Sequence, residues 1–221
     1  MAKIGRRGGS KTSPKKVRAA AANGKKGGRP MKRLKKAKMN HKLTSESKVS
    51  KFSGKVLFRI EATVDFKWAK KGEKGGWVER IENVSGDAWV SGDAEVYGNA
   101  RVSGDAWVSG DAEVYGDARV YGNARVYGNA WVYGDAWVSG DAEVYGNARV
   151  YGNARVYGDA EVYGDAEVYG DAEVYGDAEV YGDAWVYGEL KLKIGYYFGF
   201  LVKGEKAKEI KNHDGTTLLF K

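Results

Sequence analysis

The sequence predicts an all-β protein whose central part is a β-solenoid. Glycine recurs at every sixth residue from Gly86 to Gly188 without an insertion or deletion, which gives 17 complete hexads. Each hexad reads Gly-[Asp/Asn]-Ala-x-Val-[Tyr/Ser], with Ala and Val invariant and x always Trp, Glu or Arg. An uninterrupted internal repeat of this kind is typical of solenoid proteins.

The order of residues within one hexad predicts a short strand followed by a bend. In a strand, side chains alternate between two faces, so Ala and Val point to one side and x to the other. The invariant Ala and Val therefore form the predicted core, and x points outward. The [Tyr/Ser]-Gly-[Asp/Asn] triplet supplies residues suited to a bend, since glycine accepts a positive φ. A strand and a bend repeated 17 times must coil, and we assign residues 86–188 to the solenoid.

The chain before the solenoid divides into two segments. Residues 1–55 carry 19 Lys and Arg against the single acid Glu46 and contain few aromatic or β-branched residues. Such a composition favours a disordered basic arm. Residues 56–85 contain two apolar runs, 56–60 and 63–68, that read as strands, followed by a glycine-rich turn at 70–76. We expect residues 56–85 to cap the open N-terminal end of the solenoid.

A second predicted cap follows the repeats at residues 189–221. Leu190 and Leu192 continue the inward phase of Ala and Val for one more hexad. The apolar runs 196–202 and 216–220 then read as strands.

The net charge of +8 averages unlike parts of the chain. Residues 1–85 carry a net +19, residues 86–187 a net −14 and residues 188–221 a net +3. Without cysteine, disulfides and thiolate chemistry are excluded. No apolar run has the roughly 18 residues of a membrane span and no signal peptide is evident, so we expect a cytoplasmic protein.

The repeat resembles that of the hexapeptide-repeat left-handed parallel β-helix proteins. The run Val90-Ser91-Gly92-Asp93-Ala94-Glu95 places Val in that family's aliphatic position and Ala in its small inward position. The position after Val departs from the pattern, because it holds Tyr or Ser. The resemblance implies three hexads per turn, about six turns, and stacking of residues 18 apart. The flank Gly75-Gly76-Trp77-Val78-Glu79 is similar to uncharacterised bacterial and phage-encoded members.

Enzymes in this family include acyltransferases, which use a histidine base, and zinc enzymes, which use three histidines. This chain has only His41 and His213, and neither lies in the repeats. No hexad carries an inserted loop that could build a site. We therefore expect no enzymatic activity, no cofactor and no metal, and keep acyl transfer as the weakest alternative.

An 18-residue turn predicts columns of like residues, and these form the candidate partner surface. The simplest interpretation is a solvated corner stabilised by stacked aromatic rings. A calcium site, an acidic decoy for a nucleic-acid-binding protein, and a docking surface for the basic arm of the same or another copy, as in a homo-oligomer, stay open. The predicted tyrosine column is Tyr97, Tyr115, Tyr133, Tyr151, Tyr169 and Tyr187. The predicted acidic columns are Asp93, Asp111, Asp165 and Asp183, interrupted by Asn129 and Asn147, and Glu143, Glu161 and Glu179.

The basic arm contains a Gly-Arg-Pro sequence that resembles the AT-hook and the minor-groove arms of serine recombinases. There an extended Gly-Arg-Pro lies in a narrow A·T minor groove, and flanking cations contact phosphates. General polyanion binding and a solubilising tail are the alternatives. The candidate nucleic-acid-binding residues are Lys25, Lys26, Gly28, Arg29, Pro30, Lys32, Arg33, Lys35 and Lys36.

These observations predict a non-enzymatic scaffold or partner-docking protein with a nucleic-acid-binding arm. The main competing hypothesis is an acidic solenoid that inhibits a nucleic-acid-handling enzyme.

Overall fold

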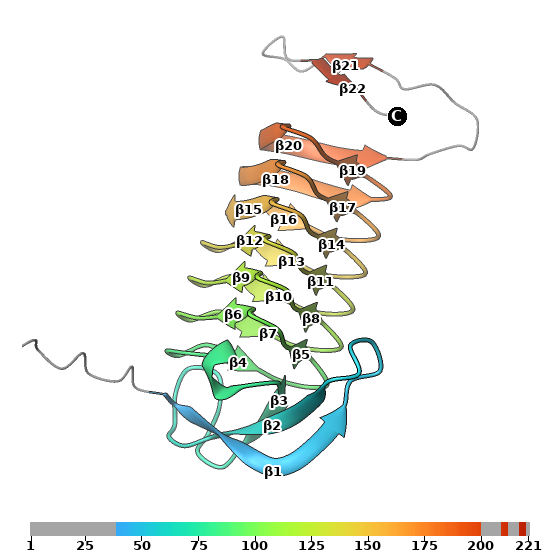
Figure 1. Cartoon of the computed structure of the whole chain (residues 1–221). Helices are drawn as coiled ribbons and strands as arrows, with labels where there is room; N and C mark the ends of the chain where they lie inside the picture. The colour runs from blue at the N-terminus through green and yellow to red at the C-terminus, as the bar shows by residue number, and fades with distance from the viewer. Residues whose placement is uncertain (1–38, 200–208, 212–216, 220–221) are drawn as a thin grey trace, which may run out of the picture. The chain divides into compact units, whose positions relative to one another are not determined.

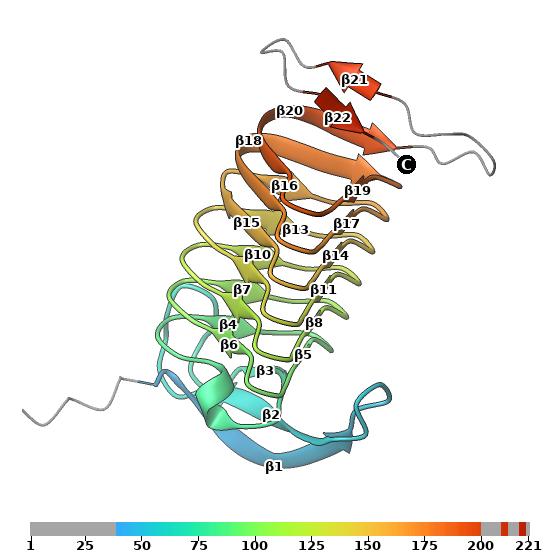
Figure 2. The ribbon, with the colours of Figure 1, turned by 45° about the horizontal axis from the view of Figure 1, so that its top comes forward.

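The computed structural model describes residues 39–199, 209–211 and 217–219. Among them the secondary structure is all β apart from one 3-10 helix, and parallel strands stack into a β-solenoid of about seven turns (Figure 1). Figure 2 shows the coils one above another, as the six-residue repeat predicted. In the part of the chain that is described, no helix is long and apolar enough to cross a membrane.

Within the hexads each turn holds 18 residues, and its three strands stack on those of the next turn in three columns. The pairing of Glu95 with Glu113 and of Val96 with Val114 illustrates the constant offset of 18. Column A contains β5 (Glu95–Val96), β8 (Glu113–Val114), β11 (Trp131–Val132), β14 (Arg149–Val150), β17 (Glu167–Val168) and β19 (Trp185–Val186). Column B contains β4 (Trp89–Val90), β7 (Trp107–Val108), β10 (Arg125–Val126), β13 (Glu143–Val144) and β16 (Glu161–Val162). Column C contains β6 (Arg101–Val102), β9 (Arg119–Val120), β12 (Trp137–Val138) and β15 (Arg155–Gly158).

Columns B and C join in one strand near the C-terminal end. The strand β18 (Glu173–Gly182) passes from column C, where it pairs with β15, to column B, where it pairs with β16. The result is an 11-stranded sheet, while column A continues into the N-terminal strands as a separate 9-stranded sheet.

The structure confirms the predicted core of inward Ala and Val side chains. Every inward Ala and Val of the 17 hexads is at most 3% exposed. Because neighbouring turns repeat the same small and branched side chains, the interior is filled at every level. This continuous burial of apolar surface is the main stabilising contribution.

The corner glycines allow the turns to stack closely. Gly116 has a φ of +72°, and a Cβ built on it would lie 2.9 Å from the backbone nitrogen of Gly134, one turn later. The adjacent backbone continues the ladder around the corner, since Asp117 N donates to Gly134 O at 2.8 Å. Glycine is therefore required here both for its conformation and for its lack of a side chain.

The N-terminal cap is larger than predicted. Strand β1 (His41–Val49) lies within the segment 1–55 that we expected to be a disordered arm, and this boundary was wrong. It pairs antiparallel with β2 (Val56–Ala62), which pairs with β3 (Lys74–Val78). β3 then runs parallel to β5 and so joins the cap to column A.

The segment between β2 and β3 also differs from the prediction. Residues 63–68 form no strand, because this loop crosses toward column B and carries aromatic side chains onto it. Part of the predicted turn 70–76 belongs to β3. The 3-10 helix η1 (Ile81–Asn83) follows and leads into the first hexad.

At the other end, β20 (Lys191–Gly199) pairs in parallel with β18 and extends the solenoid. Leu192 is buried and Leu190 packs against the core, as their inward phase predicted. Of the predicted strand 196–202, the described residues 196–199 form the end of the longer strand β20. A separate hairpin pairs β21 (Glu209–Lys211) with β22 (Thr217–Leu219), the latter inside the predicted run 216–220.

Candidate functional site

The outward side chains form three rows, one on each column. Row A consists of Glu95, Glu113, Trp131, Arg149, Glu167 and Trp185. Row B consists of Trp89, Trp107, Arg125, Glu143, Glu161 and Glu179. Row C consists of Arg101, Arg119, Trp137, Arg155 and Glu173, and continues with Lys191.

The predicted nucleic-acid-binding residues lie outside the described residues. These are Lys25, Lys26, Gly28, Arg29, Pro30, Lys32, Arg33, Lys35 and Lys36. His213, one of the two histidines considered for acyl transfer, also lies outside them.

The predicted tyrosine column is present. From Tyr97 to Tyr187 the rings stack nearly parallel, with centroids 4.9–5.2 Å apart. A second column, which we did not single out, runs from Tyr127 to Tyr181 with centroids 4.9–5.1 Å apart. Stacking of this kind adds stability beyond the burial of area. Burial also raises the pKa of Tyr115 to about 12.

The predicted acidic columns belong to two different columns of strands. Asp93, Asp111, Asp165 and Asp183 each lie two residues before an outward residue of row A. Glu143, Glu161 and Glu179 are the last three residues of row B. The candidate partner surface is therefore divided between columns A and B.

Much of the acidic charge has a donor within the chain. In the aspartate column, Asn147 Nδ2 donates to Asp165 Oδ1 at 2.8 Å, so an amide replaces one of the stacked carboxylates. In row A, Arg149 forms an ion pair of 3.1 Å with Glu167. In row B, Arg125 forms one of the same length with Glu143. These contacts favour the simplest interpretation of the columns, in which the repeats satisfy their own polar groups.

Tyrosine hydroxyls hold many of the glutamates in place. Tyr145 donates to Glu161 Oε2 at 2.9 Å and Tyr163 donates to Glu179 Oε2 at 3.2 Å. The two residues of each pair are 16 positions apart, so a corner tyrosine reaches the outward row of the next turn. A Tyr-to-Glu spacing of 16 residues in the sequence could have predicted these hydrogen bonds, but we did not consider it.

The cap covers the first residues of rows A and B, which we expected to be exposed. Trp89 is only 1% exposed because Phe66 packs edge-on against it at 5.5 Å. Trp68 stacks on Trp107 with ring centroids 5.6 Å apart. In row A, Glu95 is buried and forms an ion pair of 3.0 Å with Lys48 of β1.

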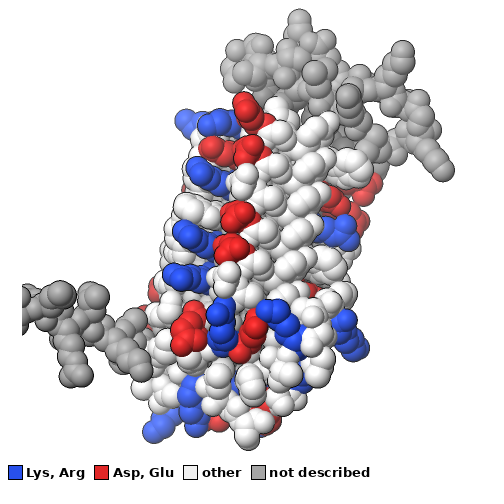
Figure 3. Space-filling model, viewed as in Figure 1, with Lys and Arg blue, Asp and Glu red and all other residues white. Residues whose placement is uncertain are grey.

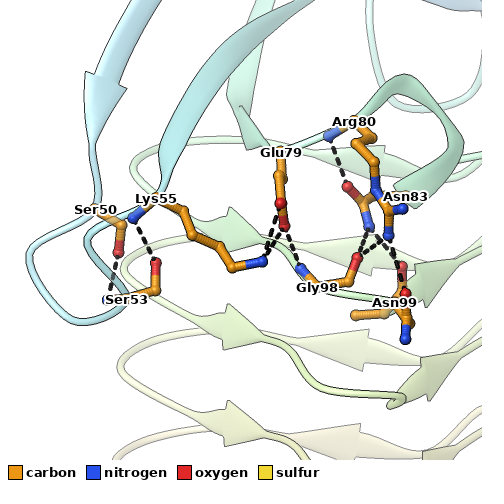
Figure 4. Close-up of polar contacts among 9 residues, drawn as sticks. Ser50, Ser53, Lys55, Glu79, Arg80, Asn83, Gly98 and Asn99 are labelled. Atoms are coloured by element: carbon orange, nitrogen blue, oxygen red, sulfur yellow. Dashed lines mark hydrogen bonds and ion pairs between the residues drawn. The ribbon is translucent and has the colours of Figure 1, made fainter.

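A polar cluster attaches the cap to the first corner of the solenoid (Figure 4). The Glu79 carboxylate accepts a hydrogen bond of 2.6 Å from Gly98 N and pairs with Lys55 Nζ at 2.8 Å. Arg80 donates to Gly98 O, and Asn83 Nδ2 donates to Ala100 O at 2.8 Å. The cluster thus satisfies backbone groups that the end of a solenoid leaves without partners.

His41 lies at the start of β1 and is 3% exposed. Burial lowers its pKa, and the nearby carbonyl groups of Ile81 and Val84 oppose this only in part. A catalytic base must reach a substrate, so a buried histidine in the cap lends no support to acyl transfer. Within the described residues, no cluster of three or more His, Cys, Asp or Glu could hold a metal ion.

Row C contains basic residues. From the sequence we considered them only as part of a solenoid with a net negative charge. Figure 3 shows Lys and Arg side chains following one edge, on the side where Figure 1 places β6, β9, β12 and β15. Arg119 and Arg155 lie 5.0 and 5.3 Å from the ring centre of Trp137, which separates them in the row. A hollow at the N-terminal end of this row is lined by Arg80, Glu82, Asn83, Asn99, Ala100, Arg101, Asp117 and Arg119.

The repeats are similar to a known family of solenoid repeats. A family model described as the YdcK Beta solenoid repeat matches residues 94–110, 112–126, 124–140, 142–158 and 148–164. No curated protein matches the chain. The comparison agrees with the architecture and identifies the chain as a repeat β-solenoid protein.

Proposed function

We propose that this chain is a non-enzymatic scaffold whose solenoid presents fixed rows of side chains and whose basic N-terminal segment binds nucleic acid. The observation that carries the scaffold role is the filled core, in which every inward Ala and Val of the hexads is at most 3% exposed. Such a core holds the outward rows at a constant spacing. The relationship to left-handed hexapeptide proteins, including phage-encoded members, is part of this proposal.

The binding of nucleic acid is supported by composition. Since β1 belongs to the cap, the relevant segment is residues 1–38, which carry 15 Lys and Arg and no Asp or Glu. Neutralised phosphates release counterions, so binding by such a segment depends steeply on salt. The Gly-Arg-Pro at 28–30 adds the hypothesis of an A·T preference.

A titration of the full chain and of residues 39–221 against A·T and G·C duplexes tests both statements. If roughly 6–10 cations meet phosphates, affinity should fall about 10³–10⁵-fold between 50 and 200 mM salt. The shorter chain should lose binding, and Arg29→Ala should remove any A·T preference. Equal binding by both chains would refute the proposal. The fragment begins at residue 39 because a start at 56 would remove β1.

An inhibitor that mimics nucleic acid is the second candidate. It is favoured by Glu161 and Glu179, each of which has one carboxylate oxygen bound by a tyrosine and no cation paired with it among the described residues. Changing the four aspartates of column A to Asn removes charge with little change of shape. A captured basic partner that binds this variant and a Glu161→Gln, Glu179→Gln variant unchanged at low salt would rule out mimicry. The four aspartates are Asp93, Asp111, Asp165 and Asp183.

A further inference from the structure

Two neighbouring pairs of like charges in the outward rows form no ion pair with an opposite charge among the described residues. In row C, Arg101 pairs in register with Arg119, and both are exposed. In row B, Glu161 pairs in register with Glu179. Like charges placed directly opposite in a sheet repel each other, so each pair is a source of unrelieved repulsion. We call them the Arg doublet and the Glu doublet.

Other like-charged contacts in the described rows are relieved within the chain. Glu95 lies beside Glu113 in row A, but Lys48 pairs with Glu95 and Tyr97 donates to Glu113. Glu143 lies beside Glu161 in row B, but Arg125 pairs with Glu143. The two doublets are therefore unusual in this chain.

Charged groups in both doublets are restricted in position by neighbouring aromatic side chains but keep hydrogen-bonding atoms that no contact within the described residues uses. Arg119 lies against the face of Trp137, 5.0 Å from its ring centre, which restricts the guanidinium and leaves its N–H edge available. Glu82 and Asp117 line the hollow beside the Arg doublet, but neither lies in an ion pair with Arg101 or Arg119. In the Glu doublet, tyrosine hydroxyls bind each Oε2, and no donor among the described residues binds either Oε1.

The two doublets match each other in spacing because they belong to the same repeat. One turn advances the chain by the 4.9 Å that separates the stacked rings of Tyr145 and Tyr163. Both doublets span one such step. The Arg doublet opens row C at its N-terminal end. The Glu doublet lies at the C-terminal end of the hexads in row B, where Glu179 is followed in register by Tyr196 of β20. Two solenoids lying side by side and antiparallel thus bring guanidinium and carboxylate groups together step for step.

We propose that column C of one copy of this chain docks against column B of a second copy through these doublets. Arg101 then faces Glu179 of the second copy, and Arg119 faces its Glu161. In the same register Arg155 faces Arg125, but Arg125 already pairs with Glu143. The N-terminal cap leaves both doublets uncovered, since it packs on the first residues of rows A and B. This inference goes beyond the scaffold role and does not depend on nucleic-acid binding.

The contact uses different surfaces on the two copies. The copy that contributes its Arg doublet therefore keeps a free Glu doublet, and its partner keeps a free Arg doublet, so larger assemblies can form. A face of about five turns is only ~25 Å long, which is small for a stable interface. We expect weak association that falls steeply with ionic strength.

Sedimentation velocity of the nuclease-treated full chain at 10–200 μM tests the inference, in 20 and 500 mM NaCl. The wild-type chain should associate at low salt and be monomeric at high salt. R101E/R119E and E161R/E179R should each weaken association at least tenfold. An equimolar mixture of these two variants should associate again in a 1:1 ratio, because the intact Glu doublet of the first faces the intact Arg doublet of the second and the two exchanged doublets also carry opposite charges.

The charge swap Arg149→Glu with Glu167→Arg is the matched control. It exchanges an ion pair in row A and should leave association unchanged. Circular dichroism checks folding, and R101Q/R119Q and E161Q/E179Q replace any variant that fails to fold.

Three results would overturn the inference. The first is a wild-type chain that stays monomeric at 200 μM in low salt. The second is association blocked by E161R/E179R alone, which would assign the Glu doublet to the basic N-terminal segment of another copy. The third is unchanged association of R101E/R119E together with weaker binding to duplex DNA, which would assign the Arg doublet to nucleic acid.

Discussion

The hydroxyl of Tyr97 donates a hydrogen bond of 2.8 Å to Oε2 of Glu113, and both residues are nearly buried. Burial raises the pKa of Glu113, although the hydrogen bond and Lys48 oppose this. The pKa of Tyr97 is also raised, first by burial and then by its carboxylate partner. The pair therefore keeps a desolvated charge in row A beneath the cap.

Replacing Glu113 with Gln should stabilise the protein at neutral pH. The amide oxygen still accepts from Tyr97, while the buried charge disappears, so we expect a gain of about 0.5–1 kcal/mol in the free energy of unfolding. A raised folded pKa means that the wild-type carboxyl loses stability as pH rises through that pKa. The advantage of the variant should shrink on acidification. Urea unfolding at pH 7 and pH 4.5 measures this.

Glu143→Gln is the control for this change. Glu143 accepts from Tyr127 in the same way but also pairs with Arg125. Its replacement removes an ion pair and should give no gain. Equal stabilisation of the two variants would show that burial of Glu113 is not the cause.

Core and outward positions of one strand should respond very differently to the same substitution. Val138 is fully buried, and Val138→Asp places an unpaired charge in the core, which should cost several kcal/mol. Trp137 is the outward neighbour, and Trp137→Asp should cost clearly less. Thermal unfolding of both variants tests the phase. A greater loss for Trp137→Asp would contradict the inward placement of Val.

Alanine substitutions at two corner glycines distinguish the cost of backbone strain from the cost of steric crowding between turns. Gly116 and Gly188 have φ values of +72° and +71°, so alanine is strained at either position by roughly 1–2 kcal/mol. A Cβ at Gly116 would also lie 2.9 Å from Gly134 N, whereas no atom of the described residues lies within 4 Å of one at Gly188. Gly116→Ala should therefore destabilise more than Gly188→Ala. Equal melting temperatures would argue against close stacking of the turns.

The buried His41 should make stability depend on pH below about 6.5. Its folded pKa is lowered by burial, so on acidification the unfolded chain takes up the proton first. Stability should fall from about pH 6.5 downward by at most about 1.4 kcal/mol per pH unit, until the folded pKa is reached. His41→Leu should flatten this part of the profile. An unchanged slope in the variant would assign the dependence to other groups.

The solenoid could be predicted from the sequence because its determinants are local and repeated. The invariant Ala and Val fixed the inward phase, and the 18-residue turn placed Tyr97 above Tyr115. The position of β1 could not be predicted in this way. Its sequence HKLTSESKV is mostly polar, and its pairing with Val56–Ala62 is a tertiary contact that composition does not reveal.

The outward rows were harder to predict for a related reason. Trp89 and Glu95 occupy outward positions of their hexads, but residues from the cap bury them. The Arg doublet was hidden in the net charge of the repeats, which averages the three columns. Assigning every hexad to its column, with 18 residues per turn, separates Arg101 and Arg119 from the acidic rows.

The constant length of the turn has a genetic consequence. A duplication of 18 residues within the hexads adds one turn, lengthens the solenoid by the 4.9 Å between stacked rings such as Tyr145 and Tyr163, and leaves each later side chain on its own column. A duplication of a single hexad is equally compatible with the Ala and Val core, but it moves each later hexad to the next column. Such an event would carry glutamates onto the face of the Arg doublet without disturbing the fold. An 18-residue duplication therefore changes the length of the solenoid alone, whereas a single-hexad duplication adds a third of a turn and also changes the pattern of charge on its faces.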